Sequence, residues 1–273
     1  MSTRSIALAN QKGGVGKTTT AVSLAACLAE RSKKALLLDL DPQGNATSAL
    51  GLEKLPGGSV YQALLGTAQL ADSIRPSGLE NLDIIASEVD LAVAEVDVAR
   101  KENYLQRLQF ALTPIHNSER YEFILVDCPP SLGILTMNAL AAVDSVLVPM
   151  QAEYFALEGL AVITRVLQQI RDGGANPSLE LQGIVLTMYD GRTNLAQQVA
   201  DEVRKHFPGK VYKTVIPRTV RLAEAPSFGK PITKYDSNSY AANCYRSLTD
   251  ELLGIAMPSA TATEPNSSTV AAA

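Results

Sequence analysis

Short apolar runs alternate with longer amphipathic segments along most of the chain. Several runs, such as Ile124-Leu125-Val126, are apolar at every position, which is typical of strands that are covered on both faces. We therefore expect an α/β fold, a mainly parallel, twisted β-sheet with helices on both faces. The expected strands are Ile6–Asn10, Ala35–Asp39, Leu82–Ala86, Phe123–Asp127, Ser145–Pro149, Leu181–Thr187 and Val211–Ile216. The expected helices are Thr18–Arg31, Asp90–Leu112, Leu135–Ala142, Leu157–Arg171, Leu195–Lys205 and Ala241–Leu253.

The length of 273 residues is enough for one large α/β domain, which we place at residues 1–257. From Pro258 onward the chain consists mainly of Ser, Thr, Ala and Pro, so residues 258–273 are expected to be a disordered tail. No apolar run approaches the roughly 18 residues that span a bilayer, and the first residues do not resemble a secretory signal. These features predict a cytoplasmic protein.

The three cysteines are far apart in sequence and show no C-x-x-C spacing. Disulfides and structural zinc are therefore not expected. Cys27 and Cys244 fall within predicted helices, where a buried cysteine packs as a small apolar residue.

Charge is distributed unevenly, although the net charge is only −4. Residues 192–234 contain nine Lys or Arg and three acidic residues, so the rest of the chain carries ten more acidic than basic residues. This asymmetry indicates a local basic face on an acidic body. A solvated surface without a partner explains the same composition.

The glycine-rich segment Lys12–Thr19 follows an apolar strand and leads into a helix, which is the arrangement of a phosphate-binding loop. In the pattern G-x-x-x-x-G-K-[ST], Lys17 reaches the β/γ-phosphates and Thr18 ligates Mg²⁺. Gln11 stands where this pattern has its first glycine, and a second lysine, Lys12, follows it. We therefore predict ATP and Mg²⁺ as cofactors. The predicted nucleotide-contacting residues here are Gln11, Lys12, Gly13, Gly14, Val15, Gly16, Lys17, Thr18 and Thr19.

Carboxylates stand at the ends of two buried strands, where α/β proteins bind ligands. Asp39 and Asp127 are candidates for the Mg²⁺ shell, and Asp41 for the residue that holds or activates the attacking water. The loop Ser131–Gly133 is suited to sensing the γ-phosphate. The alternatives are an ordinary turn after Asp39 and a plain exit from the strand at Asp127.

Four segments together resemble the ParA/Soj partitioning ATPases, a group with a deviant Walker A loop that also includes MinD. They are Lys12–Thr19, Asp39–Asn45, Asp127–Pro130 and Ile216–Ile232. The resemblance covers nearly all of Ser5–Leu253. It implies that Lys12 contacts the phosphates of the partner subunit in an ATP-dependent homodimer, as an arginine finger does in trans. It also implies slow hydrolysis that a ParB-like protein stimulates.

The resemblance gives the basic stretch a function as well. Arg192 and Arg221 match arginines through which Soj-like dimers bind double-stranded DNA without sequence preference, which implies association with the nucleoid. Pro217 and Arg218 match a segment that shapes the pocket for the base, and Arg218 could equally contact DNA. Only Ser2–Ser5 precede the first strand, so we expect no extra N-terminal DNA-binding domain.

Two other classes of function compete with DNA segregation. A MinD-like regulator would position a protein cargo and attach to a membrane through a cationic amphipathic helix, which Pro258–Ala273 does not contain. We therefore expect no membrane attachment. An electron-transfer ATPase resembling the nitrogenase iron protein would use Cys128, but it would need further cluster ligands.

Overall fold

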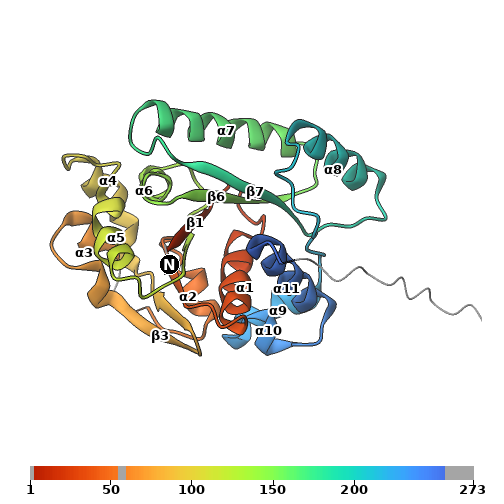
Figure 1. Cartoon of the computed structure of the whole chain (residues 1–273), viewed down its shortest axis with the longest axis horizontal. Helices are drawn as coiled ribbons and strands as arrows, with labels where there is room; N and C mark the ends of the chain where they lie inside the picture. The colour runs from red at the N-terminus through yellow and green to blue at the C-terminus, as the bar shows by residue number, and fades with distance from the viewer. Residues whose placement is uncertain (1–2, 55–59, 256–273) are drawn as a thin grey trace, which may run out of the picture.

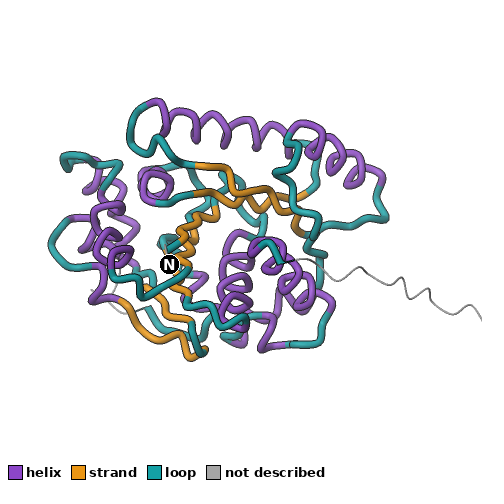
Figure 2. The backbone as a smooth tube through the Cα atoms, viewed as in Figure 1, coloured by secondary structure: helices purple, strands orange, loops and turns teal. Residues whose placement is uncertain are grey.

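The computed structural model describes residues 3–54 and 60–255, and they form one seven-stranded sheet flanked by helices (Figures 1 and 2). The expected tail at 258–273 lies outside the described residues. Every pair of neighbouring strands except β3 and β4 is parallel, so the predicted fold class is confirmed. In spatial order the strands are β3 (Ile74–Leu79), β4 (Leu82–Ile85), β2 (Ala35–Asp39), β5 (Phe123–Asp127), β1 (Arg4–Leu8), β6 (Ser145–Gln151) and β7 (Glu180–Thr187).

The helices form one layer on each face of the sheet. One layer contains α1 (Lys17–Glu30), α2 (Asn45–Ala49), α10 (Ile232–Tyr235) and α11 (Tyr240–Leu253). The other contains α3 (Val60–Leu65), α4 (Ala94–Ala99), α5 (Arg107–Asn117), α6 (Ile134–Ala142), α7 (Ala156–Asp172) and α8 (Asn194–His206). The remaining short elements are α9 (Val220–Glu224) and the 3₁₀ segments η1 (Leu70–Ser73), η2 (Val89–Val93) and η3 (Ala225–Phe228).

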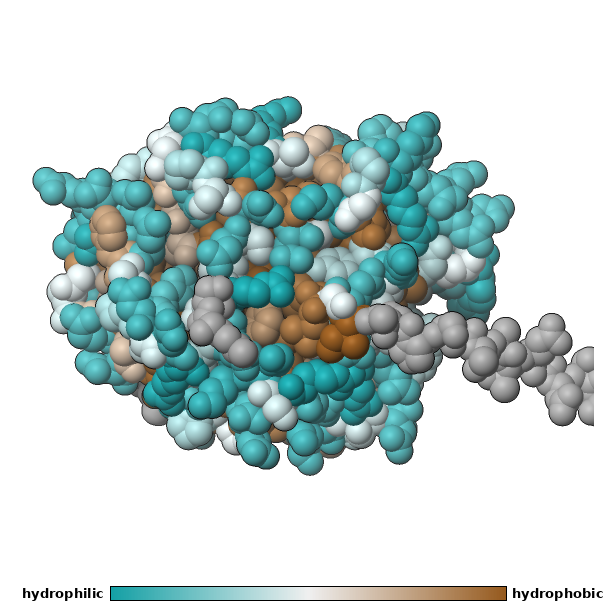
Figure 3. Space-filling model, viewed as in Figure 1, coloured by the Kyte–Doolittle hydropathy of each residue, from teal (hydrophilic) through white to brown (hydrophobic). Residues whose placement is uncertain are grey.

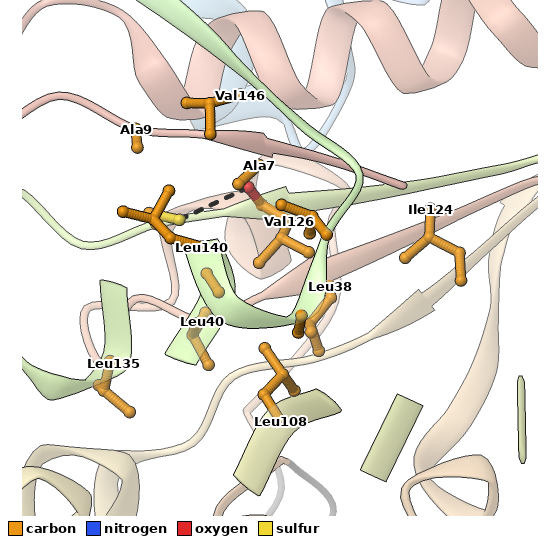
Figure 4. Packing of buried hydrophobic residues seen from close by; sticks show 14 of the residues in the cluster. Ala7, Ala9, Leu38, Leu40, Leu108, Ile124, Val126, Leu135, Leu140 and Val146 are labelled. Atoms are coloured by element: carbon orange, nitrogen blue, oxygen red, sulfur yellow. Dashed lines mark hydrogen bonds between the residues drawn. The ribbon is translucent and has the colours of Figure 1, made fainter. Parts of the chain in front are cut away.

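Alternate residues of the strands enter different cores, because successive side chains of a strand point to opposite faces. In β1, Ile6 and Leu8 pack with the α1 and α11 layer, whereas Ala7 packs with the α5 to α8 layer. Figure 4 shows the core between the sheet and the layer that contains α5 and α6. There, Leu108 and Leu140 from the helices face Val126 and Leu38 from the sheet. With the apolar side chains in these two cores, most of the face in Figure 3 is hydrophilic.

The prediction of a continuous strand at Val211–Ile216 is wrong. Only isolated bridges remain, from Val211 to Ile184 and from Pro217 to Tyr189. Between them, the backbone N–H groups of Lys213 and Thr214 donate to the carboxylate of Glu251 at 2.7 and 3.1 Å. A side chain of α11 therefore binds the backbone donors of this segment.

The predicted helix Asp90–Leu112 is also wrong, because the structure divides it into η2, α4 and α5. Asn103 takes a left-handed conformation with φ 52°, which no helix continues through. The side chain of Asn138 then donates to Tyr104 O at 2.8 Å and accepts from Leu108 N at 3.1 Å. These bonds stabilise the break and fix the start of α5.

The sequence analysis missed β3, which pairs antiparallel with β4. Pro76 and Gly78 lie within this edge strand, and both are unusual inside a strand. Cys27 and Cys244 are buried in helices, as expected, and Cys128 is buried as well. Within residues 3–54 and 60–255, the helices are too short or too polar to cross a bilayer.

Candidate nucleotide site

The loop between β1 and α1 lies at the carboxyl edge of the sheet, with its glycines in conformations that other residues rarely adopt. Gly14 and Gly16 have φ of 74° and 82°, and Gly16 is the residue that precedes the first turn of α1. The backbone of a loop of this kind can approach a phosphate chain closely, at the positive end of the helix dipole.

Hydrogen bonds with two other strands, β6 and β7, hold this loop in place. Asn10 donates to Pro149 O at 2.9 Å, and its carbonyl oxygen accepts from Lys12 N at 3.0 Å. Thr187, the last residue of β7, donates through its hydroxyl to Val15 O at 2.7 Å. The loop is thus held by contacts with the ends of β6 and β7.

A pocket of about 560 Å³ opens beside the loop. It collects residues from six parts of the chain, most of them from loops at the carboxyl edge of the sheet. Its lining residues are Gly13, Gly14, Gly16, Lys17, Thr18, Thr19, Asp41, Gln43, Asn45, Pro130, Thr187, Met188, Ile216, Pro217, Arg218, Thr219, Leu222, Ala223 and Tyr245. The predicted residues Pro217 and Arg218 therefore lie in the same cavity as the glycine-rich loop.

Lys17 is buried at the start of α1, and its ammonium donates to Lys12 O at 3.0 Å. Burial lowers the pKa of Lys17, while the charges of Asp127, Cys128 and Asp41 oppose this shift. A cation that is buried with incomplete pairing is poised to bind an anion, and the pocket places it where a phosphate chain would lie.

Asp127 and Asp39 are neighbours in the register of β5 and β2. Burial, followed by repulsion from Asp39, raises the pKa of Asp127 well above its ordinary value, with Thr18 and Lys17 opposing. Neither oxygen of Asp127 has a hydrogen-bond partner of good geometry. A buried carboxylate of this kind is costly without a ligand, so its oxygens fit a site for a hard cation beside Thr18.

Asp39 differs from Asp127, because its carboxylate is already bonded. It accepts from Thr47 N and Thr47 Oγ1 at 2.8 and 2.7 Å, and from Asp41 N at 3.3 Å. Burial raises the pKa of Asp39 to about 6, while these bonds lower it in part. Because the oxygens of Asp39 already accept these bonds, the structure favours a supporting position for Asp39 over that of a direct metal ligand.

Asp41 lines the pocket together with Lys17 and Thr18. Gln43 N donates to its carboxylate at 2.9 Å, and Ser87 Oγ donates to its carbonyl at 2.6 Å. Both ends of the residue are therefore fixed, which suits a group that orients a water molecule.

Mg²⁺ is usually held by one or two protein oxygens together with phosphate oxygens. Among the residues described, no cluster of three His, Cys, Asp or Glu could hold a metal. Thr18 in the pocket and the unpaired oxygens of Asp127 behind it supply the oxygen donors that such a shared site needs.

Lys12 does not line the pocket of its own chain. Its side chain is 52% exposed and forms an ion pair with Glu153, in the segment after β6. Gln11 is exposed and Val15 is buried, and neither side chain lines the pocket. The structure thus separates the two lysines, with Lys17 inside the cavity and Lys12 on its outer rim.

The helices of the basic stretch are divided between the two layers that flank the sheet. Helix α8 packs in the layer with α7, whereas α9 and α10 lie beside α1 and α11 on the other side of the sheet (Figure 1). Arg192 is bound by Asp190 through two bonds of 2.8 and 2.7 Å, and these bonds lower the pKa of Asp190 to about 2. Arg221 lies near Glu224 and Asp236, at 3.4 and 3.5 Å.

Several pocket residues were missed because their signal in the sequence is weak. Thr187 and Met188 end a strand without a motif, and Met188 takes a left-handed conformation with φ 48°. Tyr245 comes from α11, where its hydroxyl meets Thr20 Oγ1 at 3.2 Å. Asn45 and Gln43 stand within the quoted segment Asp39–Asn45, so their place near Asp41 could have been anticipated.

Comparison with known proteins agrees with this geometry. A family model described as an AAA domain matches residues 3–181. The chromosome partitioning protein ParA of Myxococcus xanthus is 48% identical over 251 residues, which cover 92% of this chain and 88% of that protein. The sporulation initiation inhibitor protein Soj of Bacillus subtilis is 50% identical over 248 residues, covering 90% and 97%. A crystal structure of cobyrinic acid a,c-diamide synthase from Mycobacterium smegmatis with bound ATP analog and magnesium has a TM-score of 0.79 at 36% identity, covering 92% and 94%.

Proposed function

Because this chain belongs to the ParA/Soj family of partitioning ATPases, we propose that it segregates DNA as an ATP-dependent switch. In the proposed cycle, ATP-bound chains form a sandwich dimer that binds double-stranded DNA without sequence preference on the nucleoid. A ParB-like partner then stimulates hydrolysis and releases the dimer. The observation that carries this proposal is the separation of Lys17, inside the pocket, from Lys12, on its rim.

ATP and Mg²⁺ are the cofactors of this site, and the residues around the pocket account for their binding. The glycine-rich loop surrounds the phosphates with backbone N–H groups, and Lys17 compensates their charge. Pro217 and Arg218 line the same pocket and would contact the base. Bound Mg²⁺ neutralises phosphate charge, and Thr18 and Asp127 are the residues that would hold it, with Asp39 behind them.

Hydrolysis needs a positioned water and compensation of the charge that develops on the phosphoryl oxygens. Asp41 is fixed at the pocket and would orient the water. Lys12 would supply the second cation from the partner subunit. Since Lys12 is paired with Glu153 in one chain, a dimer would have to exchange this carboxylate for phosphate oxygens.

DNA binding is proposed for Arg192 and Arg221. A dimer would present two copies of each arginine, and the affinity for DNA rises steeply with the number of phosphate contacts through counterion release. Binding to DNA would therefore depend on ATP. Charge reversal at Arg192 or Arg221 should weaken DNA binding and reduce its salt dependence while leaving the dimer intact.

The deciding experiment measures ATP hydrolysis with non-specific DNA and with the N-terminal peptide of a candidate ParB-like protein, separately and together. Synergy between the two is the expected result. The Lys17→Ala variant should not bind ATP under the same conditions, because it lacks the buried cation of the pocket. Hydrolysis that neither addition changes would refute the partitioning cycle, and normal ATP affinity of Lys17→Ala would refute the assignment of the pocket.

A further inference from the structure

Four buried residues close a ring of hydrogen bonds beside the nucleotide pocket, and we call Asp39, Asp41, Thr47 and Ser87 the polar ring. We propose that the polar ring holds Asp41 in place for hydrolysis and that Ser87 is the positioning residue that closes it. This inference rests on the proposed function, because it takes Asp41 as the group that orients the water.

One hydrogen bond joins each member of the polar ring to the next. The Ser87 hydroxyl donates to Asp41 O at 2.6 Å, and Asp41 N donates to Asp39 Oδ1 at 3.3 Å. Thr47 Oγ1 donates to Asp39 Oδ2 at 2.7 Å and accepts from Ser87 N at 3.0 Å. These bonds connect the end of β2, the short helix α2 and the segment that follows β4. The main chain of Asp41 is therefore bound at both its N–H and its carbonyl.

The polar ring is shielded from solvent. Asp39 and Thr47 are 0% exposed, Ser87 is 1% exposed and Asp41 is 5% exposed. The hydroxyl groups of Thr47 and Ser87 both donate to an oxygen inside the ring, so neither is left unpaired. A buried network that is satisfied in this way is rigid, because opening a bond leaves a polar group without its partner.

The carboxylate of Asp41 moves with the main chain of this residue. It accepts from Gln43 N at 2.9 Å, which is a bond within the same turn. On the side of β5, Leu40 N donates to Asp127 O at 3.0 Å. On the side of β4, the bond from the Ser87 hydroxyl ties the turn down. Loss of this bond would let the turn shift relative to the phosphates, and a displacement of about 1 Å is enough to slow a reaction by up to about a hundredfold.

The first test compares two buried serines whose hydroxyl groups donate to a carbonyl. Ser87→Ala removes the bond to Asp41 O, which keeps a second bond from Gly44 N at 2.8 Å. The control Ser77→Ala removes the bond from Ser77 Oγ to Leu82 O at 2.7 Å, between β3 and β4. The kcat of ATP hydrolysis should fall about tenfold in Ser87→Ala and stay unchanged in Ser77→Ala. The KM for ATP should stay the same in both, because neither serine lines the pocket.

The second test asks whether Ser87 acts through Asp41. Asp41→Asn keeps an acceptor for Gln43 N and removes the charge, so it should lower kcat more than Ser87→Ala does. Addition of Ser87→Ala to Asp41→Asn should cause no further loss, because the group that the polar ring positions is already impaired. Release of phosphate from radiolabelled ATP detects the residual hydrolysis.

The third test changes the hydroxyl of Thr47. Thr47→Val keeps the shape of the side chain but removes the acceptor of Ser87 N and a donor to Asp39, so its kcat should fall as in Ser87→Ala. Thr47→Ser keeps the hydroxyl and should restore kcat to within about twofold of the wild type, without a change in KM. Sedimentation with ATP should be the same for all variants and the wild type, so that a lower kcat is not a loss of assembly.

Three results would overturn the positioning by Ser87. They are a wild-type kcat of Ser87→Ala, an equal loss of kcat in Ser77→Ala, and a loss in the double variant that equals the product of the two single losses. A wild-type kcat of Asp41→Asn is a different result, because it would refute the role of Asp41 in the proposed function and the positioning with it. All rates are measured without DNA or a partner protein, so they do not depend on the partitioning cycle.

Discussion

At the scale of single residues, the carboxylate of Asp127 is expected to reduce the stability of the nucleotide-free protein. Its folded-state pKa lies above the unfolded value because burial and Asp39 disfavour the charge. The folded state therefore keeps a proton that the unfolded chain loses first as the pH rises. The contribution of this group to the free energy of unfolding is fully present below the unfolded pKa and is lost as the pH rises through the folded pKa.

Asp127→Asn should thus stabilise the nucleotide-free protein at pH 8, by roughly 1–3 kcal/mol, the usual scale for a buried polar group without a partner. The gain should be smaller at pH 5, because lowering the pH protonates Asp127 in the folded wild type before it protonates the unfolded chain. Urea unfolding at both pH values measures the difference, with Asp72→Asn at an exposed position as the control. A gain that is equal at both pH values would contradict the raised pKa. Mg²⁺-dependent ATP binding should weaken in the same variant.

At the scale of elements, the end of β7 supports the glycine-rich loop through the hydroxyl of Thr187. Thr187→Val keeps the shape of the side chain but leaves Val15 O without its donor. The expected cost is about 1–3 kcal/mol of stability together with several-fold weaker ATP binding, since the loop loses one of its fixed points. Thr113→Val on α5, whose hydroxyl bonds the carbonyl of Gln109 in the same helix, is the control. Urea unfolding measures the stability of both variants, and nucleotide titration measures their affinity for ATP. Unchanged ATP affinity of Thr187→Val would contradict the proposed support of the loop by Thr187.

Elements whose structure depends on local pattern were predicted well. The apolar runs at Ala35–Asp39 and Phe123–Asp127 became strands at the predicted residues, and the pattern of α1 was off by one residue at each end. Val211–Ile216 was wrong because Glu251, far away in sequence, binds two of its backbone donors. Asn138 similarly stabilises the break before α5. Such long-range bonds leave no mark in the local pattern, and the same holds for Thr187 and Tyr245 in the pocket.

At the scale of the whole molecule, DNA affinity should depend on how much of the arginine charge is already compensated. Both carboxylate oxygens of Asp190 accept from the Arg192 guanidinium in this structure, one from Nε and one from Nη2. Asp190→Asn removes this competing carboxylate, so ATP-dependent DNA binding should become tighter and its salt dependence steeper. Arg192→Ala should change both quantities in the opposite direction. Titrations at several salt concentrations measure the effect, and the charge change at the exposed Asp201→Asn is the matched control.

The two lysines of the glycine-rich loop make the assembly itself testable. Lys12 is half exposed, and its ion pair with Glu153 adds little stability, so Lys12→Ala should fold normally and keep its affinity for ATP. It should nevertheless remain monomeric with ATP, because the cation proposed for the partner's phosphates is gone. Glu153→Gln should favour the dimer, because it removes the carboxylate that pairs with Lys12. This variant should therefore dimerise with ATP at a lower protein concentration than the wild type. Sedimentation with and without ATP measures both variants. If Lys12→Ala forms the ATP-dependent dimer with wild-type affinity, the proposed contact between Lys12 and the partner's phosphates is refuted. Lys12 would then act within its own subunit, although its side chain does not line the pocket there.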